Sequence, residues 1–459
     1  MSEPPGLISL EQWTQRYPAL RAAGMAEPAY GGPLERHLDD GDDRLRVLRY
    51  DNSPAALRLW NFLLTEEQRL RAARDARRWI VGAMKDLGTV PVLAYAFDDV
   101  VAFYPDGAWW IPCVMQHSTG LLEIADRLGV GESFCPVRAM LGAFATGGHF
   151  PIPDLLACSV GAVCDDFSAI AQRVEAMGHP ILWWEMPQRS AGANGDAVEL
   201  PTGFIARREQ VALVRDELRR IARALERLTG QRLDEARLHA GIARANAVRR
   251  VLGRLRQLVY TAQPCPLPAL EMLIAEMLAI HFCSDQAESL AVLEALLAEV
   301  EHRVAAGAGV LERDAVKVFW INPVADLRMM NLLEDTGGRI AGSDYMFCHA
   351  MDPIPDDLEP FEALARMALG DPMVGPTRER GERVCRDIKQ FASEAVVISR
   401  VPGASHCAFE AAIIGGMIRD RLGLPVLEIE TPPISDAVRP ALTTRLEALM
   451  ETARARRSP

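Results

Sequence analysis

The sequence lacks the features of a membrane protein, a secreted protein or a nucleic-acid-binding protein. It contains no uncharged apolar run long enough to span a bilayer. It begins with MSEPPGLISLEQW, in which neither a basic stretch nor an apolar core indicates a secretory signal peptide. The formal net charge of -12 disfavours non-specific binding to nucleic acids or anionic membranes. We therefore expect a cytoplasmic protein with no nucleic-acid partner and no membrane partner.

A disulfide framework and a nucleotide-binding loop are also missing. The 9 cysteines are scattered over 459 residues, so in a reducing compartment we expect thiols or metal ligands rather than disulfides. No glycine-rich loop of the Walker type is present, and ATP hydrolysis is therefore not expected in this chain. Hydrophobic residues make up 49% and charged residues 24%, which is ordinary for a globular protein, and the length predicts two or three domains.

Strand patterns alternate with helical patterns in two stretches, and a long helical stretch separates them. This alternation predicts an α/β fold with two Rossmann-like (flavodoxin-like) parallel-sheet lobes. We predict an N-terminal arm and helix at 1–85, a first α/β lobe at 86–205, a helical segment at 206–312 and a second α/β lobe with a C-terminal helix at 313–459. The expected strands are 89–96, 155–160, 180–185, 315–321, 339–345, 395–399 and 425–429, and a helix is expected at 56–87.

Cys164 follows the most clearly delimited of these strands. The apolar run 155–160 is too short for a helix and lies between turn signals, as is typical of a buried parallel strand. A helical pattern begins at Phe167, so Cys164 is placed at the sheet edge where open α/β proteins bind ligands. A helix N-terminus favours the thiolate form of a cysteine. The alternative is that Cys164 is a small buried hydrophobic residue.

Two more cysteines share this context. Cys135 precedes Pro136 at the start of a predicted helix, and Cys407 lies between the strand 395–399 and a helix at 408–422. If the carboxyl edges of the two sheets face each other, Cys135, Cys164 and Cys407 converge between the lobes. Three thiolates suit a soft metal or an iron–sulfur cluster and leave one coordination position open.

Four stretches carry a resemblance to a known family. They are FCPVRAMLG at 134–142, DLLACSVGAVCD at 154–165, LTGQRLDEARLHAGIARANAVRRVL at 228–252, and Cys407 with its helix followed by GLPVLEIE at 423–430. By the order and spacing of these four stretches, the chain resembles the iron–sulfur subunits of the 2-hydroxyacyl-CoA dehydratase and benzoyl-CoA reductase family. The similarity covers roughly residues 85–452.

The resemblance implies a [4Fe–4S] cluster held by Cys135, Cys164 and Cys407, with its fourth iron position open. It also implies an acyl-CoA substrate, a homologous second subunit, and a separate ATP-hydrolysing iron–sulfur activator that delivers a low-potential electron. That electron would form a ketyl radical on the thioester, leading to dehydration or to ring reduction, and both outcomes stay open. The alternatives are a non-catalytic structural subunit of such a heterodimer and a zinc enzyme that uses the same thiolates.

Several residues close in sequence to these motifs are not predicted to bind the cluster or to act as acids or bases. Family members often carry Pro-Glu where this chain has Asp98 and Asp99, so we expect a capped helix start there instead of acid–base chemistry. Cys158 lies inside a strand and is expected to be a core residue. His349 and His406 each neighbour a cysteine, but adjacent residues point apart, so neither is predicted as a ligand; His406 can still hydrogen-bond a cluster sulfur.

Overall fold

The structure is a computed structural model of the chain. It describes residues 4–26, 30–38, 45–107, 118–190, 196–281, 284–324, 326–401, 404–430 and 437–457. Within these ranges it describes the backbone alone at residues 118–119, 281 and 405–408.

The first sheet has four parallel strands in the order β4-β3-β5-β6. This is the order of flavodoxin-like folds, in which ligands bind where the chain direction of the sheet switches, here between β3 and β5. Helices α3, α6, α7 and α8 cover the outer face through one apolar core cluster. The bounds are β3 (Trp79–Met84), β4 (Val100–Phe103), β5 (Leu155–Gly161), β6 (Ile181–Met186), α3 (Glu66–Asp75), α6 (Ser118–Arg127), α7 (Ala139–Thr146) and α8 (Asp165–Ala176).

The second sheet repeats this order as β10-β9-β11-β12, again with parallel neighbours. The switch therefore lies between β9 and β11. Two parallel sheets of the same strand order confirm the predicted pair of Rossmann-like lobes. The bounds are β9 (Val316–Ile321), β10 (Gly338–Asp344), β11 (Ala395–Arg400), β12 (Val426–Glu430), α13 (Arg328–Asp335), α14 (Pro360–Leu369), α15 (Thr377–Phe391), α16 (Ser405–Leu422) and α17 (Arg439–Ala455).

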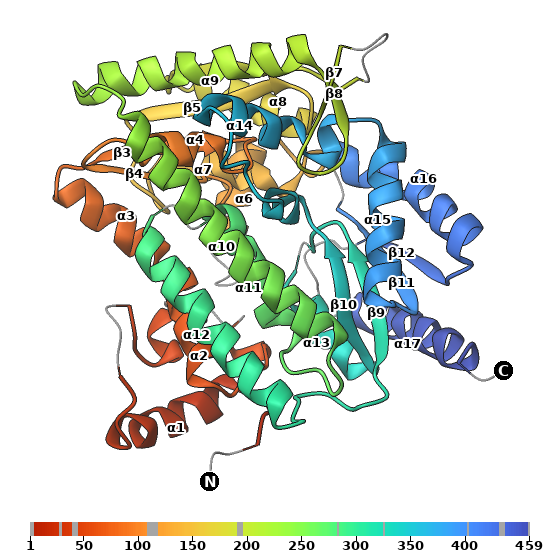
Figure 1. Cartoon of the computed structure of the whole chain (residues 1–459). Helices are drawn as coiled ribbons and strands as arrows, with labels where there is room; N and C mark the ends of the chain where they lie inside the picture. Colours follow the sequence, from red (N-terminus) through yellow and green to blue (C-terminus); the bar gives the residue numbers. More distant parts are fainter. Residues whose placement is uncertain are drawn as a thin grey trace.

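A set of long helices lies between the sheets in sequence and in space (Figure 1). Apolar residues of these helices and of both sheets form one continuous core cluster. Short elements connect the rest. The bounds are α9 (Arg208–Thr229), α10 (Glu235–Thr261), α11 (Ala269–His281), α12 (Gln286–Ala305), the ribbon β7 (Ala197–Glu199) with β8 (Ile205–Arg207), and the 3-10 turns η3 (Pro136–Arg138), η4 (Met346–Met351) and η5 (Pro372–Val374).

The N-terminal residues are a docked layer rather than only a loose arm. Leu10 and Trp13 on the first helix are each 1% exposed, and they pack into the main core. The helix expected at 56–87 ends earlier, because β3 begins at Trp79. The bounds are β1 (Leu7–Ile8), β2 (Tyr50–Asp51), α1 (Leu10–Ala22), η1 (Leu34–His37), η2 (Leu45–Val47), α2 (Pro54–Leu64) and α3 (Glu66–Asp75).

The strand expected at 89–96 is wrong. Those residues form the buried helix α4 (Thr89–Ala94), whose first turn is capped by the Asp86 carboxylate. A fully buried helix carries no amphipathic pattern, so its short apolar run has the appearance of a strand. The first strand of the lobe is instead β3, and β4 follows α4.

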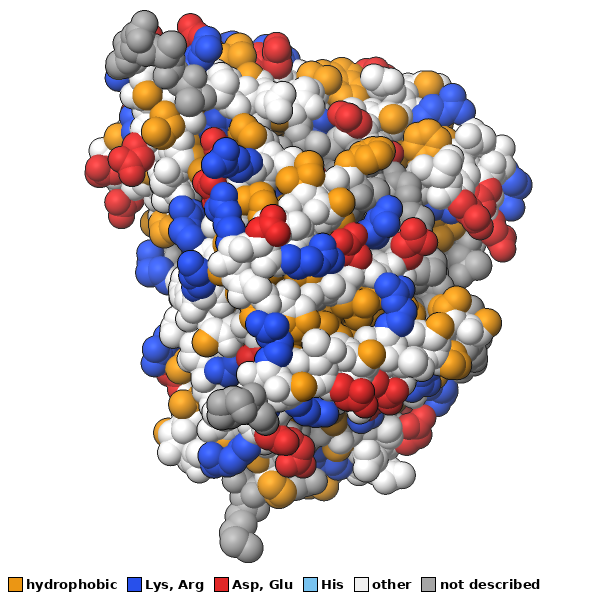
Figure 2. Space-filling view, turned by 90° about the vertical axis from the view of Figure 1, so that its right-hand side faces the viewer, with side chains coloured by type: hydrophobic (Ala, Val, Ile, Leu, Met, Phe, Trp, Pro, Cys, Tyr) orange, Lys and Arg blue, Asp and Glu red, His pale blue; other side chains and the backbone are white. Residues whose placement is uncertain are grey.

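Charges of both signs are interspersed on the face shown in Figure 2, where the blue and red side chains alternate with orange ones. Such a mixture of charges is typical of a solvated surface. None of the helices in the described part of the chain is long and apolar enough to cross a membrane.

Candidate functional site

A narrow cavity with a volume of about 30 Å³ lies at the carboxyl edge of the first sheet. Residues at the ends of β3, β4, β5 and β6 form one wall, and residues of α11, η4, α14 and η5 form the other. The cavity therefore lies between the first lobe and segments that are distant from it in the sequence, from α11 to η5. Its polar lining residues are Lys85, Asp86, Tyr104, Asp106, Ser159, Cys164 and Asp371.

Cys164 enters this cavity from the loop between β5 and α8, as the sequence predicted. It is the N-cap residue of α8 and is 3% exposed. The residue before it, Val163, has a φ of 87°, a conformation that is a genuine outlier for a β-branched side chain. The loop is also tight at Gly161, where an added Cβ would lie 2.4 Å from the Met186 carbonyl oxygen. Strained backbone of this kind is concentrated at functional sites.

The helix N-terminus does not by itself make Cys164 a thiolate. Burial raises the pKa of the Cys164 thiol to about 11, although hydrogen bonds from the N–H groups of Phe167 and Asp166 and the charge of Lys85 act in the opposite direction. The expectation that the helix dipole favours the thiolate is thus overridden by desolvation in the protein without a bound metal. A coordinated metal reverses this balance, because a ligating thiol is deprotonated outright.

Cys135 lies at the start of η3 and is partly buried against the same outer core cluster as Cys164. Cys407 is the third residue of α16, and its side chain lies outside the described part of the structure. Cys407 thus lies within the first turn of its helix, whereas Cys164 is the N-cap of α8, but the two cysteines follow corresponding strands. Cys164 follows β5 and Cys407 follows β11, which are the corresponding strands of the two sheets. Within the side chains that the structure describes, no group of three or more His, Cys, Asp or Glu residues is arranged around a metal position.

Asp106 is the titratable residue of the cavity that the sequence analysis missed. It follows β4, is 7% exposed, and its Oδ1 has no hydrogen-bond partner. Burial raises the pKa of its carboxyl to about 7, so Asp106 can hold or release a proton near neutral pH. The available signal was the β-branched and aromatic run 100–103 followed by the turn residues Pro105, Asp106 and Gly107.

Lys85 lies at the end of β3 with its ammonium group already engaged. Its Nζ donates to the Gly161 carbonyl oxygen at 3.2 Å and to Ser168 Oγ at 2.9 Å. Burial lowers its pKa, while the charges of Cys158, Cys164 and Asp165 would raise it. Lys85 thus links β3 to the loop and helix that carry Cys164.

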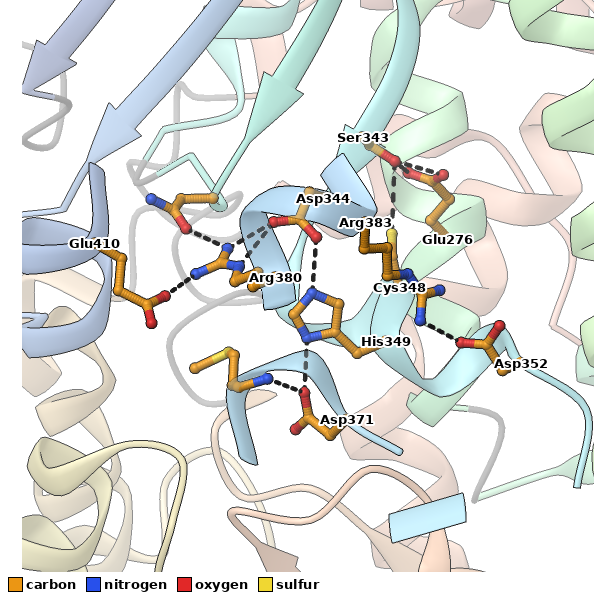
Figure 3. Close-up of polar contacts among 12 residues, drawn as sticks. Glu276, Ser343, Asp344, Cys348, His349, Asp352, Asp371, Arg380, Arg383 and Glu410 are labelled. Carbon is orange, nitrogen blue, oxygen red and sulfur yellow. Dashed lines mark hydrogen bonds and ion pairs between the residues drawn. The ribbon is translucent and has the colours of Figure 1, made fainter. Parts of the chain in front are cut away.

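The second lobe contributes a buried network of ionic groups (Figure 3). His349 lies between two carboxylates, with Nε2 2.9 Å from Asp344 Oδ1 and Nδ1 2.9 Å from Asp371 Oδ1. Its pKa is raised, because the two carboxylates outweigh the burial that would lower it. Both ring nitrogens are therefore occupied, in keeping with the prediction that His349 is not a metal ligand.

Arg380 extends the network to α16. It donates to Asp344 Oδ2 through Nε at 2.9 Å and Nη2 at 2.7 Å, to Glu410 Oε2 at 2.6 Å, and to Asn322 Oδ1 at 2.8 Å. Glu410 is three residues after Cys407 on the same helix. Through Asp371, which lines the cavity, this network connects the cavity wall to the helix that carries Cys407 (Figure 3).

Cys158, Asp98 and Asp99 have structural surroundings and do not line the cavity. Cys158 is fully buried in the outer core, and burial raises the pKa of its thiol to about 12, so the prediction that it is a core residue is confirmed. Asp98 and Asp99 do not start a helix. They form the turn before β4, where Asp98 pairs with Arg237 at 2.8 Å and Asp99 has a φ of 54°. The side chain of His406 lies outside the described part.

One comparison with known proteins is informative. The family model described as "2-hydroxyglutaryl-CoA dehydratase, D-component" matches residues 89–453. The match includes both sheets except β3, together with the helices between them and all three predicted cluster cysteines. No curated protein matches the chain.

Proposed function

The chain belongs to the family of the 2-hydroxyglutaryl-CoA dehydratase D-component, and from this premise we propose that it is a catalytic subunit of a 2-hydroxyacyl-CoA dehydratase. The observation that carries the proposal is the cavity at the switch point of the first sheet, with Cys164 in its wall. Ligands of open parallel sheets bind at this place. Dehydration is preferred to ring reduction because the family description names a dehydratase.

The proposed ligands of a [4Fe–4S] cluster are Cys135, Cys164 and Cys407. The corresponding positions of Cys164 and Cys407 in two lobes of equal strand order support a shared site. The N–H groups of Phe167 and Asp166, which hydrogen-bond the Cys164 sulfur, suit a thiolate ligand. When bound, such a cluster supplies single low-potential electrons for the radical chemistry of the thioester.

The chain's own residues then have three tasks. Apolar side chains around Cys164 exclude water, which protects a reactive substrate radical. The Asp106 carboxyl can exchange a proton at its unpartnered oxygen near neutral pH. Lys85 and Ser168 hold the loop after β5 against β3, which fixes the position of Cys164.

We propose two protein partners for this subunit. The family description calls the matching protein a component, which supports an assembly with a second, homologous subunit. The absence of a Walker-type loop from the sequence supports delivery of the electron by a separate ATP-hydrolysing iron–sulfur activator.

The test compares two buried cysteines of the same β5–α8 unit. Cys164→Ala removes a proposed ligand, and Cys158→Ala truncates a core residue six positions earlier. In anaerobically purified protein we expect Cys164→Ala and Cys407→Ala to lose iron, acid-labile sulfide and visible absorbance together. Cys158→Ala should keep all three, at a cost of about 1 kcal/mol of unfolding free energy.

Metal analysis separates this proposal from its alternatives. Zinc in place of iron and sulfide would identify a zinc–thiolate site. A full cluster in Cys164→Ala with loss in Cys158→Ala would show that the ligands are assigned wrongly. Full activity of the assembled complex after loss of this chain's cluster would identify a structural subunit.

A further inference from the structure

Lys85 is a buried cation in the wall of the cavity that Cys164 also lines. We propose that its ammonium is the counter-charge of the anionic group bound at Cys164, and that it raises the reduction potential of the proposed cluster. The inference rests on the proposed function, since it takes Cys164 as a cluster ligand. Lys85 would thus have an electrostatic role in addition to holding the loop after β5.

The side chain of Lys85 contacts the chain on both sides of Cys164. Its Nζ donates to the Gly161 carbonyl oxygen at 3.2 Å and to Ser168 Oγ at 2.9 Å. Gly161 is the last residue of β5, and Ser168 lies in the first turn of α8, so the ammonium spans the turn that carries Cys164. The cavity that Lys85 and Cys164 share has a volume of about 30 Å³, which leaves room for little more than water.

The ammonium is buried without an ion pair. Lys85 is 8% exposed, and its two hydrogen-bond acceptors, a carbonyl oxygen and a hydroxyl, are both uncharged. No carboxylate of the described residues pairs with it. Asp165, the residue after Cys164, is exposed, so water screens its charge. A water molecule in the cavity can accept the third N–H, but it cannot balance the charge, and an unpaired charge in the interior is costly.

The acidic residues of the cavity wall are engaged elsewhere. The Asp86 carboxylate caps the first turn of α4, and Asp371 Oδ1 lies 2.9 Å from His349 Nδ1. Burial raises the pKa of Asp106 to about 7, and Lys85 is not among the groups that act on this carboxyl. The negative charge that would balance Lys85 is therefore to be supplied by a bound group.

The charges of Lys85 and Cys164 act on each other. Burial has the largest effect on both groups, since it raises the pKa of the Cys164 thiol and lowers the pKa of Lys85, and the charge of each group opposes the effect of burial on the other. Among the described residues, Lys85 is the one cation that acts on Cys164. Cys158 would also attract Lys85, but burial raises the pKa of its thiol to about 12, so it is uncharged at neutral pH.

A cation at this position changes how readily a bound cluster accepts an electron. Reduction adds a negative charge to an iron–sulfur cluster, and the net charge around the cluster is one of the factors that set its potential. The effect of a charge is larger in the interior than at the surface, because the effective dielectric constant is lower there. We therefore expect the buried Lys85 ammonium to stabilise the reduced cluster.

The experiment removes the charge of Lys85 and keeps an N–H donor in its place. Lys85→Gln and the wild type are purified anaerobically and reconstituted with ferrous iron and sulfide, and the cluster potential is measured by redox titration followed by electron paramagnetic resonance. We expect Lys85→Gln to keep its iron and sulfide. Its reduction equilibrium should shift about tenfold against the reduced cluster, which lowers a one-electron potential by about 59 mV.

Two control variants separate the charge from the hydrogen bonds. Ser168→Ala removes one acceptor of the ammonium and leaves its charge in place. Lys317→Gln repeats the substitution at a half-buried residue of β9, in the other sheet. We expect the reduction equilibrium of both controls to stay within about twofold of the wild type, because neither removes a charge near Cys164.

Each outcome decides between an electrostatic and a purely structural role of Lys85. A wild-type potential in Lys85→Gln would overturn the proposal, and so would a shift of the same size in Ser168→Ala. If Lys85→Gln holds no iron and sulfide, the content of Ser168→Ala decides. A full cluster in Ser168→Ala would support the need for the charge, whereas loss of the cluster from both variants would show that the contact with the loop is what matters.

These outcomes are distinct from failure of the proposed function. A wild-type protein that holds no iron and sulfide after reconstitution would reject the cluster, and the role of Lys85 with it. A wild-type protein with a full cluster, whose potential is unchanged in Lys85→Gln, would reject the counter-charge alone.

Discussion

The carboxyl edges of the two sheets share one strand order but differ in how their polar groups are satisfied. In the first lobe Val163 has a φ of 87°, and Asp106 and Trp184 carry atoms without a hydrogen-bond partner. In the second lobe Asn322 also has a positive φ, of 66°, but its side chain accepts from Arg380 and donates to the Ser399 carbonyl oxygen. The first edge thus leaves a carboxylate oxygen and an indole N–H without a partner, whereas the second satisfies Asn322 within the protein and leaves only Arg400 Nε, among its described strand-end residues, without one.

This difference suggests that the two lobes, which share one strand order, have different roles. The network of His349, Asp344, Arg380 and Glu410 holds β10, η4, α15 and α16 together in the second lobe (Figure 3). The network thereby fixes α16, the helix that carries Cys407, to the rest of the second lobe. Functional sites commonly combine a preorganised support with a few unsatisfied or strained groups.

The largest expected effect is on the second edge. Arg380→Met removes the cation that Asp344 and Glu410 share, so that the buried Asp344 keeps only His349 as a charged partner and the partly buried Glu410 loses its ion pair. We expect a loss of about 3–5 kcal/mol of unfolding free energy, measured by urea denaturation. Arg378→Met is the control, because Arg378 lies two residues earlier on α15, is 77% exposed and pairs only at the surface with Glu382; it should cost less than about 1 kcal/mol. Similar losses in the two variants would mean that the network does not stabilise the lobe.

Residue patterns alone predicted most of this second edge and part of the first. The runs 155–160, 395–399 and 425–429 are short, apolar and bounded by turn residues, and each is a strand of a buried parallel sheet. The same criterion failed at 89–96, because a buried helix capped by Asp86 carries no polar face. It also missed β3, where Gly82 interrupts the run and an arginine-rich helix precedes it.

The candidate site was predictable only where neighbours in sequence are neighbours in space. Cys164 could be placed because its strand and helix flank it. The other groups of the cavity reach it from separate elements, such as Asp106 after β4 and Asp371 before η5. No spacing in the sequence encodes that Asp371 meets His349, because tertiary packing alone brings the two together.

A smaller effect is expected at the first edge, and it depends on pH. The pKa of Asp106 is raised by burial to about 7 from an ordinary value of 3.8, so its contribution to stability is full below about pH 4 and is lost as the pH rises through 7. In Asp106→Asn the side chain is neutral at every pH. Between pH 5 and pH 8 the unfolding free energy of the wild type should therefore fall by about 2–3 kcal/mol more than that of the variant. The two profiles are compared by urea denaturation at each pH.

Two features make this comparison specific. Glu271, whose pKa burial raises to about 8, also lowers stability as the pH rises, but it does so equally in the wild type and in Asp106→Asn. Asp75→Asn, at the exposed end of α3, is the control and should follow the wild-type profile. Parallel profiles for the wild type and Asp106→Asn would show that Asp106 is already ionised in the folded protein.

The smallest effects compare the two positive-φ residues directly, by replacing each with glycine, which adopts this conformation without strain. Asn322→Gly removes hydrogen bonds to Arg380 and to the Ser399 carbonyl oxygen, and it should cost about 1–2 kcal/mol. Val163→Gly loses side-chain packing and gains freedom in the unfolded chain, but it also relieves backbone strain, so it should remain within about 1 kcal/mol of the wild type. Urea denaturation measures both variants. If Val163→Gly is the more destabilising of the two, the packing of the Val163 side chain outweighs the strain of its backbone. The proposed difference between the two sheet edges would then not hold at Val163.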